Sequence, residues 1–233
     1  MSETMGIRPS MRHLTSAQDM VEHPKDASSA LGNAPQDWHK SLTLATSQSM
    51  SEFDFLSGID AVPPTPILIA PAPVLRQVAR EVRAEDMAFL RERLPGMFSA
   101  MYKAPGIGLA APQVGLGMRF ALVDVAEEDA PREPMVLINP EIVTDSEQMA
   151  VREEGCLSLP NQYAEVIRPE SIRVRYRDLA GEIIERDADG LLATCIQHEM
   201  DHLDGVLFVD HLSTLKRNMI MRRLAKEQKL GRR

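Results

Sequence analysis

Gln197-His198-Glu199-Met200-Asp201-His202 contains the pattern H-E-x-x-H, and the rest of the chain can be interpreted outward from it. On a helix, residues four positions apart lie on the same face, so His198 and His202 could bind one metal ion. Glu199 could then accept a proton from a water molecule that the metal activates. Short patterns recur by chance, and a helix can carry histidines for packing, so this stretch needs other residues to complete a metal site.

The residues on either side predict a helix with two distinct faces. Asp189 is a suitable N-cap and Gly205 a suitable terminator, so we expect a helix over about residues 190–203. Leu191 and Cys195 fall on the face of the two histidines. A separate face is apolar and contains Leu192, Ile196, Met200 and Leu203. This arrangement is typical of a helix that packs on one side and lines a site on another.

The composition indicates one folded domain with an additional segment. The chain has 233 residues and is 44% hydrophobic, which supports a real core. A formal net charge of −8 argues against a protein that wraps nucleic acid with its whole surface. The sequence has no basic start followed by an apolar run, and no apolar stretch of membrane-spanning length. With only Cys156 and Cys195 as cysteines, we expect a protein of the reducing cytoplasm that does not contact membranes.

The first 60 residues differ from the rest of the chain. They are polar and lack a sustained apolar periodicity, so they predict a disordered N-terminal extension. Residues 61–233 have the patterning of a folded unit, which we interpret as a single catalytic domain. Its last segment, about residues 212–233, predicts a basic helix, because Glu227 is its only acidic residue among eight Lys and Arg residues.

The segments between these landmarks predict one further helix and several short strands. Residues 84–102 carry apolar side chains at three- and four-residue steps, but Pro95-Gly96 interrupts them, so we expect a kink or two abutting helices. Residues 67–69 could form a short strand. Further strands are expected at 120–123, at 135–138 with Asn139-Pro140 closing the strand, and as a hairpin from 172–177 to a strand beginning at Ile183.

A catalytic metal needs three protein ligands and an open position. One known continuation of H-E-x-x-H would place a third histidine at position 208, which is Phe208 here. Glu227 would have to leave a basic helix to serve as a ligand. We favour Cys156, because a thiolate in a Gly-flanked, extended segment suits Zn or Fe(II). Cys195 competes with it, but one turn before His198 on the same helix it is better placed to pack beside the site.

The segment 105–115 is too rich in glycine and proline for a regular element, and its small residues would let the backbone approach a ligand or a neighbouring strand. It matches neither of the common phosphate-loop patterns. Gln113 is its one strongly polar side chain. A surface glutamine is the plain interpretation, but if the loop is buried against the site, the Gln113 amide is a candidate donor to a developing oxyanion.

Three segments of the chain resemble, in order and spacing, the signature motifs of the peptide deformylases. They are Gly106-Ile107-Gly108-Leu109-Ala110-Ala111-Pro112-Gln113, Glu154-Gly155-Cys156-Leu157-Ser158 and Gln197-His198-Glu199-Met200-Asp201-His202. The resemblance covers about residues 64–228 and includes the segment 212–217 that enters the C-terminal helix in the bacterial type. One departure is Ala72 between two prolines, where the family usually has an acidic residue. The N-terminal extension has no counterpart in the compact family domain.

The resemblance implies the fold, the reaction and the metal. The fold would be α+β, with short mixed or antiparallel strands packed around a central metal-binding helix, and with a C-terminal helix. The reaction would be removal of the formyl group from the N-terminal formylmethionine of nascent polypeptides, with release of formate. The cofactor would be one divalent metal ion, Fe(II) in the cell, with Zn or Ni as replacements. The substrate would be an N-formylmethionyl nascent peptide, and we expect a cytoplasmic monomer.

The resemblance also assigns roles to individual residues. The metal ligands would be Cys156, His198 and His202. Glu199 would take a proton from water and return it to the leaving amine. The Gln113 side-chain amide and the Leu157 backbone N–H would stabilise the oxyanion, and Gly108 would offer backbone hydrogen bonds to an extended peptide. The methionine side-chain pocket would be lined by Ile107, Leu191 and Cys195.

Two other classes of function stay open at this point. The same helix could belong to a zinc metalloprotease with Glu227 as third ligand, although the intact Cys156 motif argues against it. The chain could also be a non-catalytic binding homologue, although no ligand or catalytic position is substituted. The basic C-terminal helix is most simply a solvated helix whose cations suit the helix dipole, and contact with ribosomal RNA phosphates is the alternative.

Overall fold

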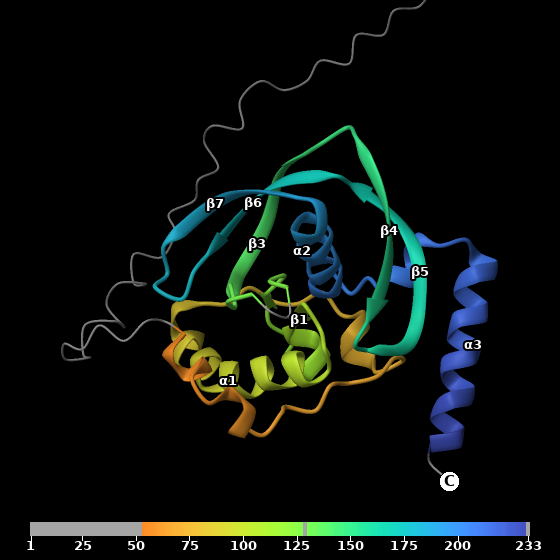
Figure 1. The fold of residues 1–233 in the computed structure, drawn as a ribbon, viewed down its shortest axis with the longest axis horizontal. Coiled ribbons are helices and arrows are strands. Elements are labelled where there is room, and N and C mark those ends of the chain that lie inside the picture. Colours follow the sequence, from red (N-terminus) through yellow and green to blue (C-terminus); the bar gives the residue numbers. More distant parts are fainter. Residues whose placement is uncertain (1–52, 128–129, 232–233) are drawn as a thin grey trace, which may run out of the picture. The chain divides into compact units, whose positions relative to one another are not determined.

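The computed structural model describes residues 53–127 and 130–231, which form three α-helices, seven β-strands and several short 3-10 turns (Figure 1). The helices are α1 (Met87–Lys103), α2 (Gly190–Leu203) and α3 (Thr214–Gly231). The strands are β1 (Gly108–Ala110), β2 (Phe120–Val123), β3 (Met135–Asp145), β4 (Met149–Cys156), β5 (Leu159–Pro169), β6 (Ser171–Arg177) and β7 (Ile183–Asp189). An antiparallel sheet has the order β1-β2-β3-β6-β7, and β4 pairs with β5 in a separate hairpin. The expected α+β fold is confirmed.

Helix α2 occupies the centre of the fold, between the large sheet and the β4–β5 hairpin (Figure 1). Its bounds are those expected from the sequence. Ile196 and Met200 pack into a cluster with Val123 and Val174 from the sheet. The polar side of α2 is buried as well, because the Gln197 amide donates 3.0 Å hydrogen bonds to the carbonyls of Pro169 and of its own helix. The helix is therefore held on several sides rather than on one.

Both ends of α2 are set by glycine. Gly190 has a φ of +55° and Gly205 a φ of +73°, a left-handed backbone conformation that residues with a side chain rarely adopt. A Cβ atom on Gly205 would also lie 2.8 Å from the carbonyl carbon of Arg76. Asp189 does occupy the N-cap position, but its side chain makes no capping hydrogen bond. The histidine-bearing helix is thus positioned by backbone geometry and close packing.

Helix α1 is continuous, so of the two alternatives expected, a kink or two abutting helices, the second is wrong. Pro95 lies inside the helix, and the buried face carries Leu90, Leu94, Met97 and Met101 at the predicted steps. Gly96 lets a neighbouring segment pass closely, since a Cβ atom there would lie 2.5 Å from Thr65 Oγ1. The carbonyl of Gly96 accepts a 2.9 Å hydrogen bond from the Thr65 amide. Pro-Gly therefore marks a packing contact here rather than a boundary.

Three other local expectations need correction. Strand β3 continues to Asp145 past Asn139, which takes a φ of +51° at a register shift, so Asn139-Pro140 does not close the strand. Residues 67–69 form no strand, because Leu68 and Ala70 bond singly to two different segments. The segment 105–115 contains β1 and a 3-10 turn (Ala111–Val114), so it is more regular than its glycine and proline content suggested.

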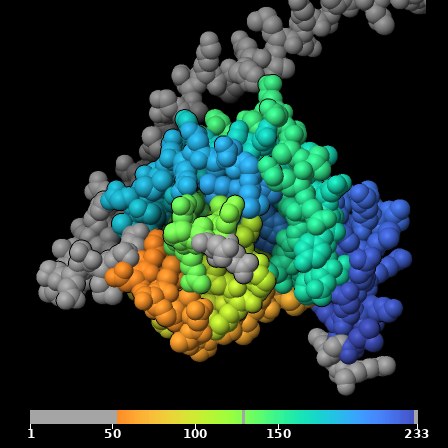
Figure 2. All heavy atoms as spheres, in the orientation of Figure 1, coloured from red at the N-terminus to blue at the C-terminus, as the bar shows by residue number. Residues whose placement is uncertain are grey.

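The ends of the described chain pack differently. Residues 1–52 of the expected extension lie outside the described residues. The part of the extension from Phe53 onward is folded. It has turns at Asp54–Leu56 and Ile59–Ala61, and Ile59 is buried against α1. At the other end α3 lies beside β5 with most of its side chains exposed (Figures 1 and 2). No helix among the described residues is long and apolar enough to cross a membrane.

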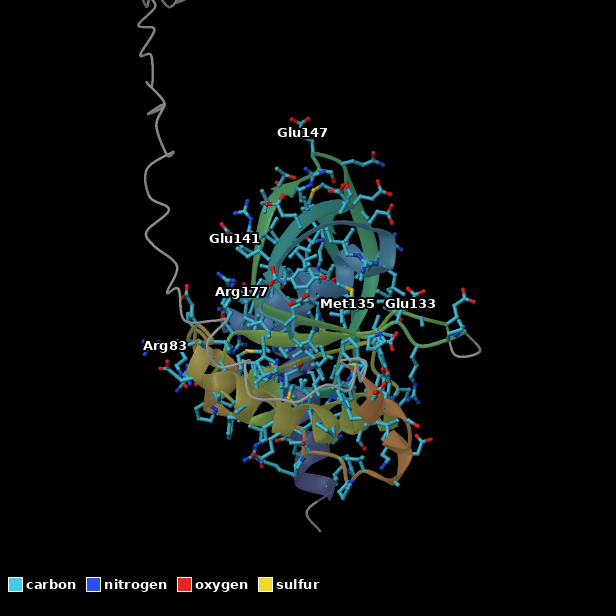
Figure 3. All side chains as sticks on the ribbon, turned by 90° about the vertical axis from the view of Figure 1, so that its left-hand side faces the viewer. Arg83, Glu133, Met135, Glu141, Glu147 and Arg177 are labelled. Carbon is cyan, nitrogen blue, oxygen red and sulfur yellow. The ribbon has the colours of Figure 1, made fainter. Side chains whose placement is uncertain are left out.

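The large sheet exposes charged side chains away from α2. Glu141 of β3 and Arg177 of β6 point outward, and Glu147 marks the turn between β3 and β4 (Figure 3). On the hairpin β6–β7, Arg173 pairs with Asp187 at 2.7 Å and Arg175 with Glu185 at 2.6 Å. These arginines meet cross-strand carboxylates, as is typical of a solvated strand face.

Candidate metal centre

Cys156, His198 and His202 form a cluster in which one ligand atom of each lies within 4.8 Å of the others. Cys156 ends β4, and its Sγ lies 3.1 Å from His202 Nε2. The two imidazoles lie one turn apart on α2 with their ring centroids separated by 5.1 Å. A thiolate and two imidazoles are a donor set typical of catalytic zinc or Fe(II) sites. The residues present therefore fit a divalent metal ion.

The other candidate ligands lie outside this cluster. Cys195 is buried, and its Sγ lies 3.4 Å from the carbonyl oxygen of Ile107, in the wall of the neighbouring groove. Glu227 is on α3 and accepts hydrogen bonds from the Gln162 amide at 3.3 and 3.4 Å. Phe208, at the position where the sequence lacks a third histidine, stacks on the ring of His198. Among the described residues, the geometry therefore does not bring Glu227 to the cluster as the metalloprotease interpretation requires.

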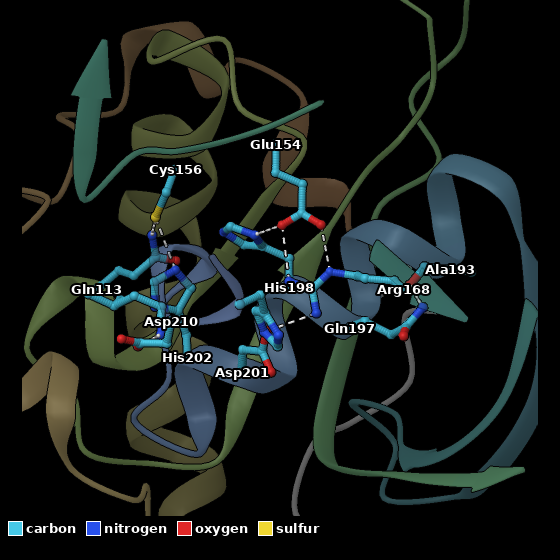
Figure 4. Close-up of polar contacts among 12 residues, drawn as sticks. Gln113, Glu154, Cys156, Arg168, Ala193, Gln197, His198, Asp201, His202 and Asp210 are labelled. Carbon is cyan, nitrogen blue, oxygen red and sulfur yellow. Dashed lines mark hydrogen bonds and ion pairs between the residues drawn. The ribbon is translucent and has the colours of Figure 1, made fainter. Parts of the chain in front are cut away.

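A buried ion pair orients His198 from behind (Figure 4). Glu154 Oε2 lies 2.8 Å from His198 Nδ1, so the other ring nitrogen is left for the ligand cluster. Arg168 binds the same carboxylate through Nε at 2.5 Å and Nη2 at 3.0 Å. Burial would raise the pKa of Glu154, but the hydrogen bonds to His198 and Arg168 outweigh it and lower the pKa to about 2. Glu154 is therefore an anion at neutral pH.

The chain of contacts continues to the surface. Arg168 Nη1 lies 2.9 Å from Asp201 Oδ2, and the same oxygen lies 2.7 Å from His211 Nε2. Both side chains of the inner pair are nearly fully buried, whereas His211 is partly exposed. Charged residues from β4, β5 and α2 thus form one network behind His198, and this network helps to fix the orientation of α2.

Glu199 lies beside the cluster in a confined position. It is 4% exposed, and its Oε2 has no hydrogen-bond partner among the described residues. A Cβ atom on Gly108 would lie 2.3 Å from Glu199 Oε1, so only glycine fits opposite the carboxyl group. Burial raises the pKa of Glu199 to about 7. Such a carboxyl group can both accept and return a proton near neutral pH.

Gln113 is buried, so its interpretation as a surface glutamine is wrong. The side chain is 1% exposed, and its Oε1 accepts a 2.7 Å hydrogen bond from the Ala110 amide. That bond turns Nε2 toward the cluster, where it lies 3.7 Å from Cys156 Sγ and 3.3 Å from Ser158 Oγ (Figure 4). The turn Ala111–Val114 therefore aims an N–H donor at the site.

A groove of about 560 Å³ opens onto the cluster. One wall is formed by Gly106-Ile107-Gly108 and the opposite wall by residues 153–157 and 159–163. Cys195, His198 and Glu199 of α2 line the groove between these walls, and Leu191 is half exposed at its rim. The residues expected from the sequence to bind substrate, namely Ile107, Gly108, Leu191 and Cys195, all line this one groove.

Comparison with known proteins identifies the family to which this site belongs. The model of the polypeptide deformylase family matches residues 64–218. The chain is a member of the polypeptide deformylase family. Peptide deformylases of Mesorhizobium japonicum and Brucella suis are 52% and 50% identical to it over 165 and 161 residues, covering 71% and 69% of this chain and 93% and 91% of the relatives. The expected membership is confirmed, and the deformylases are metal-dependent hydrolases.

Solved deformylase structures match the fold. The enzyme from Legionella pneumophila has a TM-score of 0.66 at 42% identity and covers 73% of this chain and 98% of its own. A Synechococcus elongatus deformylase in complex with actinonin has a TM-score of 0.64 at 45% identity and covers 70% of this chain and 89% of its own.

The network behind His198 is the part of this deformylase site that the motifs alone did not reveal. Part of the signal was present in the sequence, because Glu154 lies only two residues before Cys156 in β4. Arg168 of β5 pairs in register with Ala150, four residues before Glu154. Sequence alone could not place that arginine beside His198, since the register of the hairpin was not predictable.

Proposed function

We propose that this chain removes the formyl group from the N-terminal formylmethionine of nascent polypeptides and releases formate. The observation that carries the proposal is the buried Glu199, which lies beside a Cys156-His198-His202 cluster at the base of a peptide-sized groove. Membership of the deformylase family and the donor set both support this reaction.

Cys156, His198 and His202 would hold one divalent ion in the proposed enzyme. When bound, such an ion polarises a carbonyl oxygen and lowers the pKa of a water molecule. We infer that Fe(II) is the ion used in the cell, because a thiolate with two imidazoles suits it, and that Zn or Ni can replace it.

The chain's own residues account for proton transfer and charge stabilisation. Glu199 takes a proton from the attacking water and delivers it to the amine that leaves, which its pKa of about 7 permits. Gln113 Nε2 and the Leu157 backbone N–H would donate hydrogen bonds to the formyl oxygen as charge develops on it. Gln113 is already oriented by its bond to Ala110, so little reorganisation is needed during the reaction.

The groove would bind the peptide in an extended form. Among the described strands, β1 pairs only with β2 and β4 only with β5, so each has one unpaired edge. A peptide beside Gly108 could therefore bond to the backbone, as in strand addition. The methionine side chain would enter the part of the groove formed by Ile107, Leu191 and Cys195.

Formate release from formyl-Met-Ala by anaerobically prepared protein tests the proposal. We expect Glu199→Ala to keep its metal but to lose activity by about three orders of magnitude, because its proton transfer is lost. Cys156→Ala should lose the metal, whereas Cys195→Ala and the control Glu227→Ala should retain it. Near-normal activity of Glu199→Ala, or metal loss from Cys195→Ala alone, would contradict the assigned roles.

We also infer that α3 binds the ribosome through RNA phosphates, which would bring the enzyme close to nascent chains. Lys216, Arg222, Arg223, Lys226 and Lys229 are exposed and form no ion pair with the described residues, a distribution that suits RNA phosphates. Removing residues 214–233 should weaken binding to ribosomes more than it slows hydrolysis of formyl-Met-Ala, and equal ribosome binding would refute the RNA contact. We also infer that the enzyme is a monomer of the cytoplasm. Sedimentation of the purified protein tests its oligomeric state.

A further inference from the structure

The outward face of the β4–β5 hairpin carries a stripe of exposed apolar side chains. Met149 and Val151 of β4 and Tyr163 and Ile167 of β5 are each between 52% and 63% exposed. The register places Val151 opposite Ile167 and Gly155 opposite Tyr163, so alternation puts all of them on one face. Single exposed apolar residues are ordinary, but several gathered on one face, here interrupted only by the pair Glu153 and Glu165, usually mark a contact surface.

This stripe is continuous with the groove of the metal centre. Glu153, Gly155 and Tyr163 belong to the same face and line the groove. The ring of Tyr163 lies over Gly155, where an added Cβ atom would come within 2.6 Å of it. Beyond Glu153 the face continues to Val151 and Met149, and the edge of β4 stays unpaired among the described strands. A chain that leaves the groove along β4 would therefore meet this stripe.

The stripe also carries an uncompensated pair of charges. Glu153 and Glu165 lie directly opposite each other in the register. Neither forms an ion pair with any residue that the structure describes. Like charges at opposite positions on paired strands are unfavourable. A cationic side chain on a bound chain would relieve this repulsion.

We propose that the outward face of β4 binds the part of the substrate polypeptide that follows the first few residues, and that it favours a cationic residue followed by apolar ones. This inference rests on the proposed function, since the formylmethionine must lie at Cys156. From there the substrate runs toward Met149, antiparallel to β4. Extended chains advance equally per residue, so about the fourth residue lies opposite Glu153, about the sixth opposite Val151 and about the eighth opposite Met149.

The first test compares a long and a short substrate. A formyl-Met nonapeptide with Leu at its sixth and eighth positions is compared with formyl-Met-Ala in the holoenzyme and in a Met149→Ser/Val151→Ser variant. The variant should raise KM for the nonapeptide by about tenfold, because apolar contacts are lost, and leave formyl-Met-Ala unchanged. Ile183→Ser on β7 is the matched control, with an equally exposed side chain outside the groove.

The second test concerns the charges. Nonapeptides with Lys or Glu at the fourth position should differ in kcat/KM by about fivefold in favour of Lys at low salt, and Glu153→Gln/Glu165→Gln should abolish the difference. An unchanged ratio of long to short substrate in the β4 variant, or an effect equal to that of Ile183→Ser, would overturn the inference. So would a wild-type dimer that the β4 variant converts to monomer, because the face would then join two copies. Absence of formate from both peptides would instead refute the proposed function.

Discussion

Arg168 is the residue through which the charge network acts on the metal centre. It binds Glu154 through two nitrogens and Asp201 through the third, and it is nearly fully buried. Glu154 in turn fixes His198. The arginine forms no hydrogen bond with Cys156, His198 or His202, yet it holds the carboxylate that orients His198.

Replacing Arg168 by Met should therefore weaken metal binding without removing a ligand. We expect about a 10- to 100-fold loss of affinity, because Glu154 would lose its partner and His198 its fixed orientation. Competition with a chromophoric chelator measures this. Arg175→Met removes an exposed pair with Glu185 and should leave the affinity unchanged. Equal affinities of the two variants would show that the network does not support the metal.

Glu154 should also contribute a pH-dependent part of the stability. Its pKa falls from about 4.5 in the unfolded chain to about 2 in the folded protein. The contribution is fully present above about pH 4.5 and is lost as the pH falls toward 2, because the unfolded state binds the proton first. Urea unfolding between pH 6 and pH 3 should therefore show a steeper loss of stability in the wild type than in Glu154→Gln. Parallel curves would contradict this assignment.

At the scale of elements, the position of α2 depends on how the helix ends at Gly205. Gly205 combines a left-handed φ with a close approach to the carbonyl of Arg76, and the Ala79 amide bonds to the Leu203 carbonyl at 2.8 Å. The end of the helix and the segment after Arg76 are therefore locked together.

Gly205→Ala should destabilise the fold by about 2 kcal/mol or more, since both the backbone conformation and the contact are lost. Gly58 has a φ of +89° with open space around it, so Gly58→Ala provides the matched control for the backbone strain alone. Chemical denaturation of both variants gives the difference. If the two substitutions cost the same, the contact with Arg76 has no energetic role.

Sequence patterns predicted the helices and strands more accurately than they predicted the contacts between these elements. The bounds of α2 and β2 followed from local sequence patterns, because these depend on neighbouring residues. The structure also brings Cys156, His198 and His202 together, as the motifs predicted. Pro95-Gly96 predicted an interruption of the helix, but the structure shows that Gly96 instead allows close packing against Thr65, which is distant in sequence. The burial of Gln113 was likewise left open, because only the packed fold shows which loop covers the site.

At the scale of the whole molecule, the folded unit begins before the segment that the deformylase family shares. The family match starts at residue 64, but Phe53, Phe55 and Ile59 already pack around Phe98 of α1. Ser99 Oγ also donates a 2.6 Å hydrogen bond to the Val62 carbonyl. We therefore propose that residues 53–63 belong to the catalytic domain.

A chain that begins at residue 64 should consequently be less stable than one that begins at residue 53. We expect the melting temperature to fall by about 5–10 °C, because buried apolar contacts on α1 are removed. Formate release from formyl-Met-Ala at 25 °C should stay equal, since no residue of the metal cluster lies in the deleted segment. Equal melting temperatures would show that residues 53–63 are not part of the domain.

The separation of the ligands along the chain has a consequence for biosynthesis. Cys156 and His202 are 46 residues apart, and β4 and α2 meet only after the intervening strands have formed. The three donor atoms can therefore converge only after the chain has emerged from the ribosome as far as the end of α2. If these three residues hold an ion, we expect it to be inserted late in synthesis, after α2 has emerged.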